Sequence, residues 1–502
     1  MELYKSDLDR VDCCHELVSS ALHRHYLQAC VAHVYRERTP RIRIAMVWRL
    51  CCWLLVATSG VLAAEAAATA SQRHLIRIPL ESDDHLRFTG AVQVGSPPRP
   101  ARVVFDTGSS DTWVASEIAV HLDNAAAQTA FSIGYGGGVV SGLAVPTDLR
   151  LGGSEADALL LHHVPVGVVD SMTAVIPDLE VHGVVGLGME TLVQINTSSS
   201  LLELIVAQQG LTVPVTFSIF ISSHSSAHPP SQLIFGGEDH TLIDPGATRF
   251  VFSTISDVEL RGLPRSSSSA LSKGFGFWAL RVRRLEFDNE LLPLEKAGSQ
   301  FSAALLDSGT SVLLLPQHAF HVVVQGLLVR FGKRLLPRLS EQDSLPTCRC
   351  CQVHEFPPLA IDIIVDDNSK RDVKTQRFVL RGSDYARCDW RRRECTAMID
   401  LIHSSEVSDR FDVVILGPVF FRAFYPLFDY SNKYVQLACT LDDHGVCPGG
   451  LEPALDYRGQ PYDPDSEEPR ANRSFVGVCA AVTALALLAG LRMLLSAHIQ
   501  SK

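Results

Sequence analysis

A short pattern occurs twice in this sequence: an apolar run, then Asp, then Thr or Ser, then Gly. The first copy is VVFDTGSSDTWV at residues 103–114, and the second is AALLDSGTSVLLL at 303–315, with its aspartate 201 residues further on. The apolar run predicts a buried strand, and the residues after it predict a tight turn because Gly tolerates positive φ. A carboxylate at the end of a buried strand is costly to desolvate. The repeat therefore constrains the chain to two similar halves, each of which delivers one aspartate.

A second apolar element, ending in glycine, follows each copy of the pattern. VVGLG at 184–188 comes about 80 residues after the first aspartate, and VILG at 414–417 comes about 110 residues after the second. Each half thus predicts a strand, an Asp turn, several further strands and an apolar-Gly strand. Two such halves facing each other would bring Asp106 and Asp307 together at a shared cleft.

Two carboxyl groups that lie close together share one proton, because both cannot be ionised at once. The charged carboxylate can take a proton from a water held between them, while the protonated carboxyl polarises a peptide carbonyl. Such a pair titrates as a unit, and acidic conditions favour its singly protonated form. Thr107 and Ser308, which follow the two aspartates, supply hydroxyls that could bond across the two turns. The pattern predicts acid–base hydrolysis of peptide bonds, with no cofactor and no metal.

At this point the chain resembles the pepsin-like (family A1) aspartic endopeptidases, hydrolases of the EC 3.4.23 type, over about residues 86–440. The motifs that support the resemblance occur in the family's order: FTGAVQVGSPP at 88–98, FDTGSSDTWV at 105–114, FSIGYGGG at 131–138, GVVGLG at 183–188, LIFGGED at 233–239, LLDSGTS at 305–311, and VVILGPVFFRAFYPLFDYSNKYVQLA at 413–438. The resemblance implies a mostly β, bilobal fold of two six-stranded-barrel-like lobes, with the active site in the cleft between them.

The same resemblance implies roles for individual residues. Asp106 and Asp307 are similar to the family's catalytic pair, and Tyr135, with Gly136 beside it, is similar to the tyrosine at the tip of the flap that covers the substrate. Trp113 is similar to the tryptophan whose indole N–H steadies that tyrosine. The residues that would support the pair are Thr107, Gly108, Ser109, Ser308, Gly309 and Thr310.

Two apolar segments predict the compartment. The run LCCWLLVATSGVLAA at 50–64 follows several arginines and precedes small residues, which is typical of a secretory signal, with Met46 as a possible true start. An uncleaved signal anchor and a buried helix remain alternatives. Near the other end, SFVGVCAAVTALALLAGL at 474–491 has no charge and predicts a membrane span, the alternative being a signal for a lipid anchor. A tethered chain of this kind is similar to β-secretase and to the membrane-bound aspartic proteases of protozoa.

These segments and motifs predict the domain organisation. HLIRIPL at 74–80 resembles the start of an inhibitory pro-segment, but it lies too close to Phe88 to cross a cleft, so we expect no zymogen step. The predicted parts are an N-terminal extension at 1–45, a signal peptide or anchor at 46–64, a short leader at 65–85, an N-terminal lobe at 86–240, a C-terminal lobe at 241–445, a stalk at 446–473, a transmembrane helix at 474–495 and a short cytosolic tail at 496–502.

The cysteines of the predicted lumenal region are confined to its C-terminal part, where they indicate disulfides in an oxidising compartment. The candidates are Cys348, Cys350, Cys351, Cys388, Cys395, Cys439 and Cys447. Seven cysteines leave one odd, and Cys439 with Cys447 is the most local pair. Zinc at the CRCC cluster is the alternative that the spacing leaves open. Asn196 in NTS is a candidate glycosylation site.

The formal net charge of −11 and the absence of a long basic run argue against a nucleic-acid partner. The basic stretch RCDWRRREC at 387–395 predicts a surface loop that is solvated rather than substrate-binding. We therefore expect a monomeric, single-pass membrane endopeptidase of the secretory pathway, with a lumenal or extracellular catalytic domain and protein or peptide substrates. The alternatives are a catalytically inactive peptide-binding protein on the same fold and a structural ectodomain.

Overall fold

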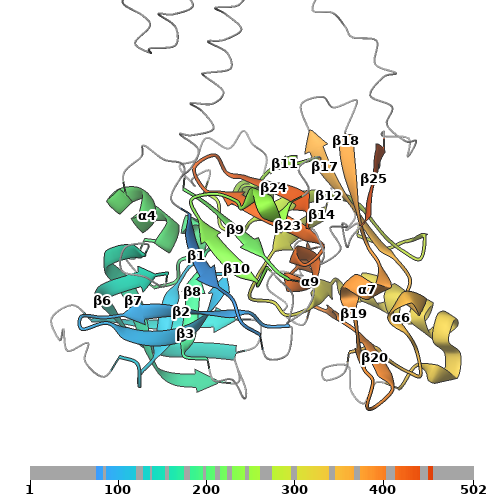
Figure 1. Ribbon diagram of the computed structural model, residues 1–502, viewed down its shortest axis with the longest axis horizontal. Helices are drawn as coiled ribbons and strands as arrows, with labels where there is room; N and C mark the ends of the chain where they lie inside the picture. The colour runs from blue at the N-terminus through green and yellow to red at the C-terminus, as the bar shows by residue number, and fades with distance from the viewer. Residues whose placement is uncertain are drawn as a thin grey trace, which may run out of the picture. The chain divides into compact units, whose positions relative to one another are not determined.

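The computed structural model describes the following residues, all within the compact unit His74–Lys502: 75–82, 86–119, 128–135, 138–152, 158–173, 181–195, 199–209, 215–222, 229–243, 248–260, 274–294, 302–337, 345–366, 374–402, 413–440 and 450–455. This part of the chain is mostly β, as the sequence predicted, and its strands form four sheets (Figure 1). Two of the sheets belong to the two halves of a bilobal fold, a third combines strands from both halves, and the fourth is small.

The sheet of the first half has seven strands in the order β2-β3-β8-β4-β7-β6-β5. Their bounds are β2 Thr89–Val94, β3 Arg99–Asp106, β4 Thr112–Ala115, β5 Thr129–Tyr135, β6 Gly138–Leu151, β7 Leu159–Thr173 and β8 Gly183–Gly186. Strand β3 is buried along its last four residues, since a run of Val and Phe fits a strand that is covered on both faces. It pairs in parallel with β8, so that Asp106 lies opposite Gly186.

The sheet of the second half contains β21, β15, β22, β14, β12, β17, β18 and β25 in that order, with β13 paired to β12. The bounds are β12 Ala279–Phe287, β13 Glu290–Leu291, β14 Ser302–Leu306, β15 Leu313–Leu315, β17 Leu359–Asp366, β18 Lys374–Leu380, β21 Ile399–Leu401, β22 Val413–Leu416 and β25 Gly450–Leu455. Strand β14 pairs in parallel with β22, with Leu306 opposite Leu416. The duplicated motifs therefore form matching strand pairs, β3 with β8 and β14 with β22.

The third sheet has six strands in the order β1-β10-β9-β23-β24-β11. Strands β9 and β10 follow the apolar-Gly strand β8 of the first half, and β23 and β24 follow the apolar-Gly strand β22 of the second half. The two pairs meet where Phe217 of β9 lies opposite Phe428 of β23. The bounds are β1 Ile76–Pro79, β9 Thr216–Phe220, β10 Gln232–Phe235, β11 Phe250–Ser253, β23 Phe424–Asp429 and β24 Tyr434–Cys439.

In the part of the chain that the structure describes, the helices are short apart from α4 and α6, and a small sheet lies beside α6. The helices are α4 Leu201–Gln209, α5 Asp257–Leu260, α6 Gln317–Phe331, α7 Gly382–Tyr385 and α9 Pro418–Phe421, and the 3₁₀ turns are η2 Glu190–Leu192, η3 His240–Leu242, η4 Gly332–Arg334 and η5 Val353–Glu355. The small sheet has the order β16-β20-β19, with bounds β16 Thr347–Arg349, β19 Ala386–Asp389 and β20 Glu394–Ala397. Figure 1 shows β19 and β20 below α6 and α7.

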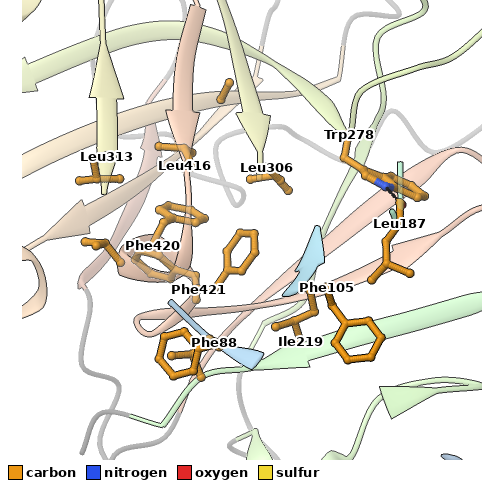
Figure 2. Packing of buried hydrophobic residues seen from close by; sticks show 14 of the residues in the cluster. Phe88, Phe105, Leu187, Ile219, Trp278, Leu306, Leu313, Leu416, Phe420 and Phe421 are labelled. Carbon is orange, nitrogen blue, oxygen red and sulfur yellow. Dashed lines mark hydrogen bonds between the residues drawn. The ribbon is translucent and has the colours of Figure 1, made fainter. Parts of the chain in front are cut away.

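One large hydrophobic cluster includes residues of both halves, which explains why the two motif strands are fixed relative to each other. Figure 2 shows Phe105 and Leu187 from the first half together with Leu306 and Leu416 from the second. Trp278 is fully buried and donates its indole N–H to the carbonyl of Leu187 at 2.8 Å. Removing apolar side chains of this size from water is the largest favourable term in folding.

Two of the predicted segments, the leader and the stalk, contain residues that the structure describes. Strand β1 falls within the predicted leader and pairs with β10, and its Ile78 is buried. Strand β25 falls within the predicted stalk and pairs with β18. In the described part of the chain, no helix has both the length and the hydropathy needed to span a membrane. The predicted span at 474–495 and the predicted signal at 46–64 lie outside the described residues.

Candidate active site

The two motif aspartates lie side by side at the ends of equivalent strands. Asp106 is the last residue of β3, and Asp307 follows directly after β14. Their carboxyl groups lie close enough for the charge of Asp307 to act directly on Asp106, which is only 8% exposed. The parallel neighbours β8 and β22 support the two strand ends on one side, so the chain positions the pair through the rigid part of the fold.

Each carboxylate is held by the turn that follows it, and the two turns use the same contacts. The backbone N–H of Gly108 donates to Oδ1 of Asp106 at 2.8 Å, and the hydroxyl of Ser109 donates to Oδ2 at 2.5 Å. In the second turn the N–H of Gly309 donates to Oδ1 of Asp307 at 2.8 Å. The hydroxyl of Thr310 donates to Oδ2 of Asp307 at 2.6 Å. Both carboxylates are thereby fixed in orientation as well as in position.

A reciprocal set of hydrogen bonds joins the two turns. The hydroxyl of Ser308 accepts from the N–H of Thr107 at 2.9 Å and donates to the carbonyl of Phe105 at 2.6 Å. The hydroxyl of Thr107 accepts from the N–H of Ser308 at 2.9 Å and donates to the carbonyl of Leu306 at 2.7 Å. The four residues that take part are buried, so no water molecule competes for these hydrogen bonds. The bonding across the turns that we expected of Thr107 and Ser308 is present.

The glycine of each turn lies against the carboxylate of the other half. A Cβ atom placed on Gly108 would lie 2.5 Å from Cγ of Asp307, which no real side chain tolerates. A Cβ on Gly309 would overlap the carboxylate of Asp106 in the same way. The two turns can approach closely enough to pair their carboxyl groups only because neither glycine has a side chain.

The environment of Asp106 favours its protonated form. Burial raises the pKa of Asp106 well above its usual range, and the negative charge of Asp307 raises it further. The hydrogen bonds from Ser109 and Gly108 act in the opposite direction but do not compensate. The pair therefore retains one proton at a pH at which an isolated aspartate would have lost it.

A β-hairpin made of β5 and β6 places Tyr135 next to the pair. The indole N–H of Trp113 donates to the hydroxyl of Tyr135 at 2.8 Å, and Trp113 itself is buried. Tyr135 lies close enough to Asp106 for the charge of that carboxylate to act on its hydroxyl. Burial raises the pKa of Tyr135, with the charge of Asp106 as the next cause, so its hydroxyl stays protonated. Gly136, predicted to lie at the tip of this hairpin, is outside the described residues.

The sequence model of the eukaryotic aspartyl protease family matches residues 87–440, which contain the whole of this arrangement. The chain belongs to the eukaryotic aspartyl protease family. Pregnancy-associated glycoprotein 1 of Bos taurus is 23% identical over 377 residues, 72% of this chain and 83% of that protein. Cathepsin E-A of Xenopus laevis is 25% identical over 72% of this chain and 81% of its own length. Napsin-A of Homo sapiens is 25% identical over 54% and 62%.

Two residues that steady the β5–β6 hairpin were not predicted from the sequence. Asp111 is 3% exposed and accepts the backbone N–H groups of Gln194 at 2.8 Å and of Ile195 at 3.0 Å. The side-chain oxygen of Gln194 accepts the N–H of Gly134 in β5 at 3.4 Å. Burial raises the pKa of Asp111. A carboxylate inside the first motif was a visible signal for Asp111, whereas Gln194 lies 60 residues from Gly134 and no local pattern marks it.

The cysteine predictions are correct in part. Disulfides join Cys348 to Cys351 and Cys388 to Cys395. Cys350, which we included among the disulfide candidates, is free. It is exposed in a turn with a φ of 57°, while its neighbours bond to each other. Cys439 is in a disulfide, and its candidate partner Cys447 lies outside the described residues, as does Asn196.

Proposed function

We propose that this chain is an aspartic endopeptidase that uses Asp106 and Asp307 as its catalytic pair. The observation that supports the proposal most strongly is the close approach of the two aspartate turns, in which each carboxyl group is oriented by its own Gly N–H and hydroxyl. A pair that shares one proton provides a general acid and a general base at the same point. The membership of the family agrees with this chemistry.

In the proposed reaction a water molecule is bound between the two carboxyl groups. The charged carboxylate takes one proton from this water as the oxygen attacks the peptide carbonyl carbon, and the protonated carboxyl donates a hydrogen bond to the carbonyl oxygen. In the second step a proton passes to the leaving nitrogen as the C–N bond breaks, which restores the shared proton. Tyr135 would cover the substrate, because Trp113 holds its hydroxyl beside the pair. No cofactor takes part in these steps.

We further propose that the catalytic domain works in the lumen of the secretory pathway or outside the cell, on secretory or membrane proteins. The disulfides of the second half agree with an oxidising compartment. A membrane tether through residues 474–495 and a monomeric state stay predictions from the sequence. A catalytically inactive peptide-binding protein on the same fold is the second candidate function. It is less favoured because both aspartates, both turn glycines and Tyr135 are present.

The proposal is tested by digestion of a peptide library with the purified full-length chain between about pH 4 and pH 9. The expected result is cleavage at acidic and neutral pH that falls as the pH rises through the upper apparent pKa of the pair. This direction follows from the raised pKa of Asp106, since the shared proton is lost above it. Peptide binding without cleavage at any pH would instead support the inactive peptide-binding protein.

A further inference from the structure

The turn between β19 and β20 presents an exposed tryptophan and three exposed arginines. The disulfide Cys388–Cys395 closes the hairpin directly below this turn. Within the turn, the side chain of Asp389 accepts the backbone N–H groups of Arg391 at 2.8 Å and of Arg392 at 3.2 Å. Trp390 is 78% exposed, and the Arg391 guanidinium lies 5.4 Å from the centre of its ring. The turn is therefore held in one conformation before it meets any partner.

Two further arginines lie beside the turn and extend its positive charge. Arg349 of β16 forms an ion pair with Glu394 at 3.1 Å. The N–H of Cys350 donates to the carbonyl of Arg393 at 2.6 Å, and Arg334 donates to the carbonyl of Cys350 at 3.4 Å. We call the set Arg334, Arg349, Trp390, Arg391, Arg392 and Arg393 the hairpin surface.

The hairpin surface keeps an excess of positive charge after its ion pairs are counted. Arg334, Arg349 and Arg392 each have a carboxylate partner, Glu355, Glu394 and Asp389 respectively. Arg391 and Arg393 have none among the residues that the structure describes. The whole chain has a formal net charge of −11, so the positive charge of the hairpin surface is opposite in sign to that of the chain.

Residue type and rigidity both favour binding over simple solvation. Tryptophan and arginine are the residues that most often dominate binding energy at protein interfaces. A preformed turn loses little conformational entropy when it binds. The guanidinium group matches a carboxylate with two parallel hydrogen bonds. We propose that the hairpin surface binds acidic segments of protein substrates, and this inference rests on the proposed endopeptidase function. It replaces our expectation that the basic stretch is merely solvated.

The connectivity places the hairpin surface within reach of a bound substrate. Strand β20 continues through Met398 into β21, and Ile399 of β21 lies opposite Leu313 of β15. Strand β15 follows the second aspartate turn. The path from Arg393 to Ile399 spans about 20 Å of strand, and that from Leu313 to Asp307 at most about 20 Å. An acidic segment about a dozen extended residues from the scissile bond can therefore reach the surface while the substrate occupies the site.

The test uses the full-length chain and one fluorogenic core peptide chosen from the library digest. Separate peptides carry an extension at the N-terminal or at the C-terminal end of the core. Each extension is a flexible linker of about 14 residues followed by about six Glu or, in the matched peptide, about six Gln. The Glu extension on one side is expected to lower KM about fivefold or more with little change in kcat, because it adds binding away from the reacting bond. The effect should shrink as salt rises from about 50 to about 300 mM.

Two variants assign the effect to the hairpin surface. Arg391→Glu combined with Arg393→Glu is expected to remove the advantage of the Glu extension and leave cleavage of the core peptide unchanged. Arg283→Glu, at an exposed arginine of β12, is the matched control and should keep most of the advantage. A KM advantage that is absent in the unmodified chain, or that survives in the double variant, overturns the proposal.

Failure of the hairpin proposal can be distinguished from failure of the proposed function. If no peptide is cleaved, the endopeptidase function fails, and the hairpin surface is tested by fluorescence anisotropy of a labelled peptide of about six Glu. Binding that is lost in the double variant supports the proposal, and equal binding by both chains overturns it. Vesicles containing phosphatidylserine are the remaining probe. If the hairpin surface binds these vesicles but not the acidic peptide, its partner is an anionic membrane and the proposal is wrong.

Discussion

The replacement Ser308→Ala removes the hydroxyl that joins the two aspartate turns in one direction. That hydroxyl accepts from the N–H of Thr107 at 2.9 Å and donates to the carbonyl of Phe105 at 2.6 Å. Thr107 and Phe105 are both buried, so water cannot replace the lost partner without opening the structure. Each unsatisfied buried group costs about 1–3 kcal/mol, so we expect a loss of about 2–4 kcal/mol in the free energy of unfolding. That is a large part of the stability of an ordinary domain.

The activity is expected to fall as well, because the same bonds set the separation of Asp106 and Asp307. A displacement of about 1 Å at a reacting group can lower the rate about 100-fold, and we expect a loss of about tenfold to 100-fold in kcat/KM for Ser308→Ala. Ser308→Thr keeps the hydroxyl, which its counterpart Thr107 shows to be compatible with such a turn, and should restore most of the activity. Urea denaturation followed by circular dichroism measures the first effect, and peptide cleavage measures the second.

Ser302→Ala is the matched control for this prediction. Ser302 is also buried at the start of β14, but its hydroxyl donates only to the carbonyl of Leu294, at 2.6 Å. Its loss should cost about 1–2 kcal/mol with no specific effect on kcat. If Ser308→Ala is no less stable than the unmodified chain, or if it loses no more activity than Ser302→Ala, the reasoning about the joined turns is refuted.

Two further predictions concern the hairpin and the pH dependence of folding. Trp113→Phe removes the 2.8 Å hydrogen bond to the Tyr135 hydroxyl and should raise KM about fivefold, with a smaller effect on kcat; an unchanged KM would show that the indole N–H does not position Tyr135. Asp384 is 5% exposed, and burial raises its pKa to about 6 from 3.8. Its contribution to stability is therefore present below about pH 4 and is lost as pH rises through about 6, by at most about 3 kcal/mol. The urea midpoint should therefore rise when the pH is lowered from 7 to 4, and Asp384→Asn should reduce this rise. An unchanged rise would show that Asp384 is not its source.

The pairing of the two halves was predictable because the pattern around Asp106 is repeated around Asp307. A carboxylate at the end of a buried strand is costly to desolvate, and a second carboxyl group that shares its proton offsets this cost. The sequence contains only one other copy of the pattern, at Asp307. The hydroxyls of Thr107 and Ser308 were predictable for the same reason, since they occupy equivalent positions. The roles of Tyr135 and Trp113 came from the resemblance to a family rather than from the residues themselves, and their hydrogen bond agrees with that resemblance.

Contacts between distant segments could not be predicted in this way. The bond from Gly134 to Gln194 depends on how the β5–β6 hairpin packs on a loop, and nothing in the local pattern of either segment indicates it. Residues 451–473, rich in Pro, Asp and Glu, predict an extended stalk, and nothing in that composition indicates that β25 pairs with β18. The free state of Cys350 depends on which neighbours bond to each other, and a spacing of cysteines does not determine that.

The central claim is that Asp106 and Asp307 act as one unit, and a double-mutant cycle tests it most directly. Asp106→Asn, Asp307→Asn and the double variant keep the size of the side chains while removing the shared proton, and kcat/KM is measured for each on the same peptide at acidic pH. We expect each single variant to lose at least about 10⁴-fold and the double variant to be little worse than either, because a unit that lacks one member is already inactive. Substantial activity in either single variant, or losses that multiply in the double variant, would contradict the account.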